Sequence, residues 1–245
     1  MTRLFLTVCG ALLASICLLS TLGFGQTAQH PTESASDLVK QFKSEAVFWK
    51  QFEAAKKIVA LHDKSVLQDL EPWLSNKDMH LRGNAAFIFG GLGDDRGFQV
   101  IKAILEDRSG RRAVSALDDT GALYLGRQIT EDRYYAAHLF GDLKDVRAVS
   151  ILVPLLKDKE VNYIVPWSLG QIGDKSAIPP LIEMLDDKNP DMRVLAIYAL
   201  EQLDAKEALP KMRVLLADDE TIHFDGLGAV SDAARKAIDK LERKH

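Results

Sequence analysis

The pattern of apolar and polar positions repeats along this chain with a period near 30 residues. Between Ala136 and Leu216 an apolar run, a turn that ends in aspartate and a second apolar run recur three times. Phe140, Leu169 and Leu200 hold the same place in these copies, at offsets of 29 and 31 residues. A fixed period of this length is typical of a repeat architecture.

Each copy contains two amphipathic helices. Apolar residues are spaced i, i+3, i+4 before the turn and again after it, which puts them on one face of a helix. Neither helix can bury that face alone, so the pairs are expected to stack around a continuous core. Extending the register to Phe89 and Ile58 gives five copies, separated by 31, 51, 29 and 31 residues. The sequence therefore predicts an all-α fold, a right-handed α-solenoid of about five two-helix repeats plus a C-terminal capping helix.

The predicted domain covers residues 37–245. Its repeats are expected near residues 46–76, 77–107, 131–158, 159–187 and 190–218, with the cap at 230–245.

The turns inside the repeats carry residues suited to ending one helix and starting the next. Gly93 and Gly173 can adopt a positive φ and stop the first helix. Asp94, Asp145 and Asp174 can cap the free N–H groups of the second helix.

Two segments carry this pattern best, Val161–Asp174 and Met192–Leu203. Their arrangement, Val-Arg/Asn-x-x-Ala-x-x-Ala-Leu-Gly-x-Ile-Gly-Asp, resembles a HEAT repeat. The short period is similar to the HEAT-like subclass of phycobilisome lyases, and the resemblance covers about residues 46–216. It implies a helical solenoid, and it raises the alternative of a lyase or chaperone-like protein resembling those that attach bilins to phycobiliproteins.

The N-terminal segment has the layout of a secretory signal peptide. Arg3 gives a basic start, residues 4–25 are uncharged and mostly apolar, and Gly23 and Gly25 offer small residues for cleavage. We expect residues 1–25 to be a signal peptide, residues 26–36 a flexible spacer, and the protein to be exported, periplasmic or secreted. An uncleaved N-terminal membrane anchor is the alternative, because the run is long enough to cross a bilayer. Cleavage would leave no stable membrane span.

Composition argues against several classes of function. The formal net charge is -4, whereas a dedicated nucleic-acid binder usually shows a concentrated positive field. The only cysteines, Cys9 and Cys17, lie in the N-terminal apolar stretch, and the histidines form no pair at metal-binding spacing. We find no catalytic or nucleotide-binding motif, and we predict no cofactor, no metal and no catalytic residue.

Two joints between repeats are longer than the period requires. Residues 107–129 insert about 20 residues, and residues 217–229 are several residues too long. Both connect a second helix to the next first helix, so both are expected on the same rim, where inserted loops often bind partners. The first insertion predicts a positive patch, unless it is simply a solvated loop. Its candidate binding residues are Arg108, Arg111, Arg112 and Arg127, beside Arg133 and opposite Asp118 and Asp119.

Aromatic residues also occupy two first-helix positions, four residues apart, that are usually polar and exposed in HEAT repeats. Residues i and i+4 share a helix face, so stacked repeats would align these side chains as a stripe. We call this the aromatic stripe. The alternative is that the insertion or the curvature of the solenoid buries it as core. Its members are Phe52, Phe87, Tyr134, His138, Tyr163, Trp167 and Tyr198.

The sequence thus favours an exported, non-catalytic scaffold or assembly factor that binds another protein through its solenoid surface and its one-rim loops. A bilin-lyase-like activity is the competing hypothesis, although the lyases that the chain resembles act on cytoplasmic proteins. Binding of a peptide or a peptidoglycan fragment along the groove is a third possibility.

Overall fold

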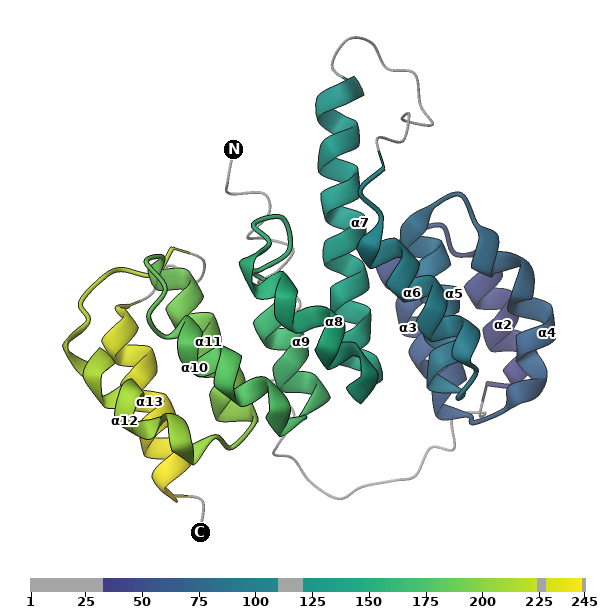
Figure 1. Cartoon of the computed structure of the whole chain (residues 1–245). Helices are drawn as coiled ribbons and strands as arrows, with labels where there is room; N and C mark the ends of the chain where they lie inside the picture. Colours follow the sequence, from purple (N-terminus) through teal and green to yellow (C-terminus); the bar gives the residue numbers. More distant parts are fainter. Residues whose placement is uncertain (1–32, 110–120, 224–227, 244–245) are drawn as a thin grey trace.

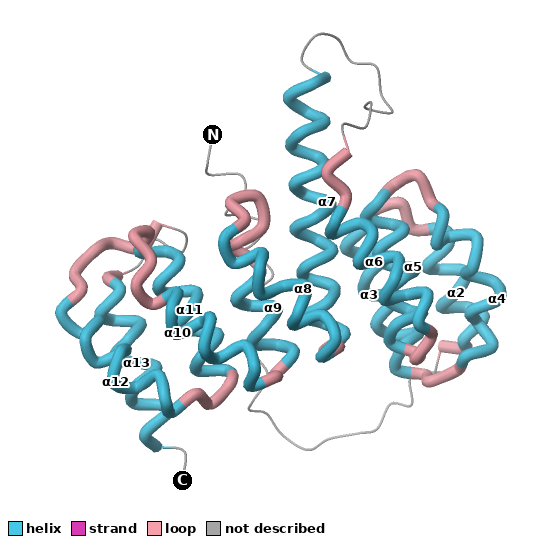
Figure 2. Tube along the Cα trace, in the orientation of Figure 1, coloured by secondary structure: helices cyan, strands magenta, loops and turns pink. Residues whose placement is uncertain are grey.

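The protein is a curved row of helix pairs (Figure 1). The structure, a computed structural model, describes residues 33–109, 121–223 and 228–243. Figure 2 shows helices joined by short loops, and no strand is drawn in the described part of the chain. The all-α solenoid predicted from the period is confirmed. The predicted signal peptide lies outside the described residues.

Each of the five predicted repeats forms a first helix. These are α3 (Phe48–Ala60), α5 (Met79–Gly91), α7 (Gly121–Leu143), α9 (Val165–Ile172) and α11 (Pro190–Gln202). They pack on one another along the row, with α3 against α5, α5 against α7, α7 against α9 and α9 against α11. Helix α2 (Ala35–Ser44) packs on α3 at the start, and α13 (Val230–Arg243) packs on α11 as the cap.

The second helices are less regular, and most are broken into short α and 3₁₀ turns. Proline causes part of this, since Pro154 lies inside the second helix of its repeat, where the chain changes from α to 3₁₀. The segments are η1 (Lys64–Val66), α4 (Leu67–Leu70) and η2 (Glu71–Ser75); α6 (Asp95–Glu106); η3 (Val146–Ala148), α8 (Val149–Leu152) and η4 (Val153–Lys157); η5 (Lys175–Ala177) and α10 (Ile178–Met184); η6 (Lys206–Ala208), α12 (Leu209–Val214) and η7 (Leu215–Ala217).

The core follows the register that the sequence predicts. The five aligned residues Ile58, Phe89, Phe140, Leu169 and Leu200 are all fully buried, each with 0% of its surface exposed. Each therefore contributes its whole apolar side chain to one continuous hydrophobic cluster. Burying the same position in every repeat is what makes the stacked pairs interdependent.

The turns within repeats also form as predicted. Gly93 and Gly173 adopt φ of 78° and 80° at the ends of their helices. Three repeats use other residues at this left-handed position, and they have φ between 53° and 55°: His62, Lys144 and Asp204. In the first four repeats an aspartate follows and accepts a hydrogen bond from a backbone N–H two residues on, as Asp94 and Asp174 do. In the fifth repeat Ala205 takes this place and makes no such bond.

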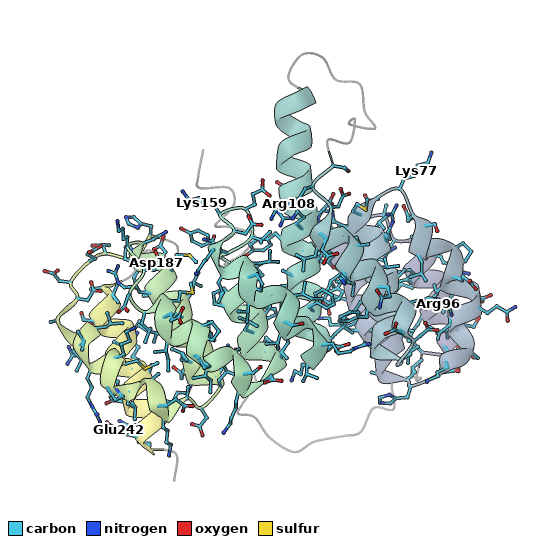
Figure 3. The ribbon with its side chains drawn as sticks, viewed as in Figure 1. Lys77, Arg96, Arg108, Lys159, Asp187 and Glu242 are labelled. Atoms are coloured by element: carbon cyan, nitrogen blue, oxygen red, sulfur yellow. The ribbon has the colours of Figure 1, made fainter. Side chains whose placement is uncertain are left out.

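The first insertion differs from the predicted loop. Its second part is helical, because α7 begins at Gly121, nine residues before the position equivalent to Met79 of α5. As a result α7 stands above the rest of the row (Figure 1). The joints from each second helix to the next first helix lie along the edge from which α7 rises, as the labelled residues Lys77, Arg108, Lys159 and Asp187 show (Figure 3). We call this edge the joint rim.

The second long joint folds back on the row. The backbone N–H of His223 donates to the Asp191 carboxylate at the start of α11, at 2.6 Å, and Ser231 N–H donates to the Asp218 carbonyl at 2.9 Å. These bonds hold the joint against α11 and α13 on the joint rim. Among the residues that the structure describes, no helix is long and apolar enough to cross a bilayer.

Candidate functional site

Aromatic rings from α3, α5, α7 and α9 meet in one cluster. Tyr135 of α7 lies at its centre, 5.2 Å from the Phe48 ring and 5.0 Å from the His80 ring, measured between centroids. Gly83 allows α5 to approach α7 closely beside this ring, since a Cβ there would come within 2.9 Å of Cδ1 of Leu139. We call this the ring cluster. Its members are Phe48, Phe52, His80, Phe87, Tyr135, His138 and Trp167.

The buried hydroxyl of Tyr135 is held by a chain of amides. It donates to Oδ1 of Asn84 at 2.5 Å, and Nδ2 of Asn84 donates to Oε1 of Gln51 at 2.9 Å. Both amide side chains are fully buried, at 0% exposure. Burial raises the pKa of the Tyr135 phenol well above its ordinary 10, so this hydroxyl stays protonated at neutral pH. The arrangement is a satisfied polar core, which locks α3, α5 and α7 together.

The aromatic stripe is buried at one end and exposed at the other. Phe52 and Phe87 are each 6% exposed, because Phe87, Tyr135 and His138 pack around Phe52. The prediction of an outward-facing stripe is wrong for these two residues, and they belong to the core. Tyr134, His138 and Trp167 are half-buried.

At the other end of the stripe, Tyr198 of α11 is 37% exposed and Tyr163 is 39% exposed. Tyr163 does not share a helix face with Trp167, contrary to the i, i+4 prediction, because α9 begins only at Val165 with Pro166 in its first turn. Tyr163 instead lies at the joint rim, where its hydroxyl accepts a hydrogen bond from Nδ2 of Asn189 at 2.9 Å. On the helix face of the stripe, the accessible rings are therefore the exposed Tyr198 and the half-buried Trp167, on two adjacent first helices.

His138 links the buried and exposed ends. Its ring stacks on Trp167 at 4.5 Å between centroids and 15° between planes. Its Nδ1 lies 3.3 Å from Oδ2 of Asp142, one turn further along α7. Gly141 permits this contact between α7 and α9, since a Cβ there would come within 2.8 Å of the Trp167 ring.

Burial dominates the titration of both groups in this pair. It lowers the pKa of the His138 imidazole from 6.5 to about 4, and the nearby Lys56 ammonium acts in the same direction. It raises the pKa of the Asp142 carboxyl from 3.8 to about 6, while Lys56 opposes the rise and Glu53 adds to it. His138 is therefore neutral at pH 7 and does not form an ion pair with Asp142.

The predicted positive patch is partly neutralised. Arg133 is 1% exposed, and its guanidinium pairs with Asp158 at 2.6 Å and with Glu160. Arg108 pairs with the same Asp158 oxygen at 2.5 Å. The two arginines at the ends of the insertion are thus fastened to one carboxylate of the next joint. Arg111 and Arg112 lie outside the described residues, and Arg127 lies in α7 with its side chain outside them.

Arg193 repeats this design in the fifth repeat. It is 6% exposed and bonds Oδ2 of Asp218 at 2.8 Å and the carbonyl of Asp187 at 2.7 Å. Arg133 and Arg193 each bond an aspartate 25 residues on. Arg133 and Arg193 occupy equivalent positions in the third and fifth repeats, and both serve to hold the fold. In the described ranges, no group of three or more His, Cys, Asp or Glu side chains is arranged to hold a metal ion.

Comparison with known proteins agrees with the repeat register. Residues 125–187 and 157–222 match the family described as HEAT repeats. This part of the chain carries HEAT repeats. The matched region contains α9, α11 and most of α7, and so includes His138, Trp167 and Tyr198 of the aromatic stripe.

Part of the chain is also similar to a phycocyanobilin lyase subunit and to a bilin biosynthesis protein. The chain is 36% identical over 104 residues to phycocyanobilin lyase subunit alpha of Picosynechococcus sp., a match covering 37% of this chain and 39% of that protein. It is 32% identical over 87 residues to the bilin biosynthesis protein PecE of Mastigocladus laminosus, covering 34% of this chain and 32% of that one. Each match thus spans less than half of the relative.

A solved structure of the CpcE and CpcF complex of phycocyanin lyase from Nostoc sp. PCC7120 resembles the chain with a TM-score of 0.46. It is 18% identical, and the match covers 90% of this chain and 80% of that one.

Proposed function

We propose that this HEAT-repeat chain is an exported, non-catalytic scaffold or assembly factor that binds a partner protein through Trp167 and Tyr198. The observation that carries the proposal is the gradient along the aromatic stripe. Phe52 and Phe87 are buried as core, whereas Tyr198, one repeat beyond Trp167, is 37% exposed. The rings needed for packing are covered, and those at the C-terminal end of the stripe are accessible.

These exposed rings suit a protein-binding surface. Tyrosine and tryptophan bury a large rigid area with few rotatable bonds, and both are enriched among residues that dominate binding energy. Trp167 is held by its stack on His138, so it loses little further freedom on binding. Gln171 and Gln202 are joined by a hydrogen bond of 3.2 Å beside the rings and supply the polar border that such surfaces usually have.

The name of one relative supports a role alongside another protein. Phycocyanobilin lyase subunit alpha is named as a subunit, and the matched segment is 36% identical. The proposal that a partner chain is engaged is consistent with that name.

Capture from an extract of the source organism tests this proposal. The bait is the full-length chain, either wild type or with Trp167→Ser and Tyr198→Ser, and the readout is the set of bound proteins. We expect one protein in stoichiometric amount on the wild type, reduced at least tenfold on the double variant. Val214→Ser is the matched control, because Val214 is 72% exposed on the second-helix side. Equal capture by all three baits would contradict the proposal.

Bilin handling is a second candidate function, favoured by the names of both relatives. Mixing the full-length chain with free phycocyanobilin tests it, with the visible absorption spectrum as the readout. A shifted spectrum that survives gel filtration would favour a lyase-like role over the scaffold. An unchanged spectrum with no retained pigment would exclude it.

A further inference from the structure

The five joints between repeats all close with the same hydrogen-bond pattern. In each, an asparagine or aspartate N–H donates to the carbonyl three residues earlier. The side-chain oxygen of the same residue accepts from the backbone N–H two residues later, at 2.8 to 3.2 Å. The five residues are Asn76, Asp107, Asp158, Asp187 and Asp218. One residue lies inside this turn, between the asparagine or aspartate and the residue that donates the N–H. The turn fixes the direction of this enclosed residue.

That enclosed residue is basic in the first four joints. Lys77, Arg108, Lys159 and Lys188 follow one another at the repeat offsets of 31, 51 and 29 residues, and all four are exposed. Figure 3 shows the first three along the joint rim. In the fifth joint the equivalent residue is Asp219, so the row ends with a charge of the opposite sign. We call the four basic residues the rim row.

Several acidic neighbours of the rim row already have partners other than its lysines. Asp78 accepts from two backbone N–H groups at the start of α5. Asp158 and Glu160 pair with the buried Arg133. Within the described ranges, by contrast, Lys77, Lys159 and Lys188 form no ion pair or hydrogen bond. Among the described residues, the rim therefore presents the three lysines outward without a partner, whereas Arg108 is paired with Asp158.

We propose that the rim row binds an extended acidic segment of a partner protein. Neighbouring helices in packed proteins lie about 8–10 Å apart, and an extended chain advances about 3.3–3.6 Å per residue, so one repeat spans about three residues. A peptide with a carboxylate at every third position places one acid opposite each cation. Such pairs are exposed and individually weak, but they set register and direction along the row.

The shape of the rim disfavours a membrane surface as the ligand. Helix α7 rises from the middle of the row (Figure 1), near the labelled Arg108 and Lys159 (Figure 3). Its nine additional residues reach about 13 Å above the rim at 1.5 Å each, beyond the screening length of about 8–10 Å in physiological salt. A flat bilayer would meet α7 first, whereas a single extended chain can pass beside it.

Nucleic acid fits the row less well than a peptide does. Its phosphates carry one charge about every 3.4 Å along a strand, which is far denser than one cation per repeat. The chain as a whole is also acidic, with a formal net charge of -4, so no long-range field draws a polyanion to the rim.

The test measures binding of synthetic peptides to the full-length chain. The probe peptide carries glutamate at every third position between serine and glycine, and the control peptide has the same composition with its glutamates contiguous. We expect the spaced peptide to bind more tightly than the contiguous one, and binding to weaken with salt. The triple variant Lys77→Gln, Lys159→Gln, Lys188→Gln is expected to bind the spaced peptide roughly tenfold to hundredfold more weakly. This follows from a loss of affinity of about two- to fivefold for each exposed ion pair removed.

The matched control replaces three exposed lysines away from the joint rim, Lys64, Lys175 and Lys236, with glutamine. It changes the net charge equally and is expected to bind like the wild type. Equal losses in both triple variants, or no preference for the spaced peptide, would overturn the proposal. The proposal would also be overturned if single-stranded RNA or anionic vesicles bound more tightly than the spaced peptide and the rim variant abolished that binding. Because Trp167 and Tyr198 are unchanged in both variants, failure here leaves the capture experiment above unaffected.

Discussion

Replacing Asp142 by asparagine is expected to stabilise the protein at neutral pH. The Asp142 side chain is 26% exposed and lies 3.3 Å from the neutral ring of His138. Because burial disfavours its charged form, its pKa is raised in the folded state to about 6, from 3.8. The folded protein therefore binds this proton more tightly than the unfolded chain does.

The sign of the effect follows from linkage. A raised folded pKa contributes stability that is present below the unfolded value and is lost as pH rises through the folded value. For Asp142 the loss falls between about pH 4 and pH 6. At about 1.4 kcal/mol per pKa unit, a shift of about two units amounts to about 3 kcal/mol at pH 7. Asparagine cannot ionise, so the variant escapes this loss.

The assay is urea unfolding of wild type and Asp142→Asn between pH 4 and pH 7, followed by tryptophan fluorescence and circular dichroism. The quantity of interest is the difference in free energy of unfolding between the two proteins. The pKa of His138 is lowered to about 4, so this ring is neutral over most of the pH range and its own titration affects the difference only near pH 4. We expect little difference at pH 4 and a gain of up to about 3 kcal/mol for the variant at pH 7. A difference that is independent of pH, or that favours the wild type as pH rises, would refute the reasoning.

Further predictions concern the joints and turns. Asp158→Asn should lower the free energy of unfolding by about 3 kcal/mol, because it leaves the buried Arg133 guanidinium without one of its carboxylates. Glu160→Gln changes the half-exposed partner of the same guanidinium and should lower the free energy of unfolding by less than about 1 kcal/mol. Gly173→Ala should cost about 1 kcal/mol, because φ is 80° there although no atom would be contacted. Lys144→Gly, at φ of 53°, should instead give a gain of about 0.5 kcal/mol. Chemical denaturation of the four variants checks these values, and a loss at Lys144 would contradict the turn analysis.

The sequence predicted the repeat fold because the period fixes which residues are buried. Ile58 and Leu200 lie four repeats apart and occupy equivalent core positions, and no long-range information is needed to align them. The turn residues were predictable for a similar local reason. A helix that ends in Gly173 followed by Asp174 carries its stop and its next cap in adjacent residues.

The candidate site was only partly predictable, because exposure depends on which side chains cross between helices. Tyr135 is not predictable from the aromatic stripe, since its position along α7 belongs to neither of the two columns. The small residue at Gly83 indicates only that α5 and α7 approach closely there, at Leu139. Likewise Arg108 and Arg133 pair with Asp158 from 50 and 25 positions away, respectively. Their charges are neutralised only once the joints are placed side by side.

The central claim, that a partner binds at the exposed end of the aromatic stripe, is tested most directly by site-specific photo-crosslinking in the source cells. A photoreactive phenylalanine derivative replaces Tyr198 on the first-helix side or, as the comparison, Val214 on the second-helix side; these residues are 37% and 72% exposed. We predict a single crosslinked protein from position 198 and none from position 214. Crosslinking from position 214 alone, or the same products from both, would contradict the account.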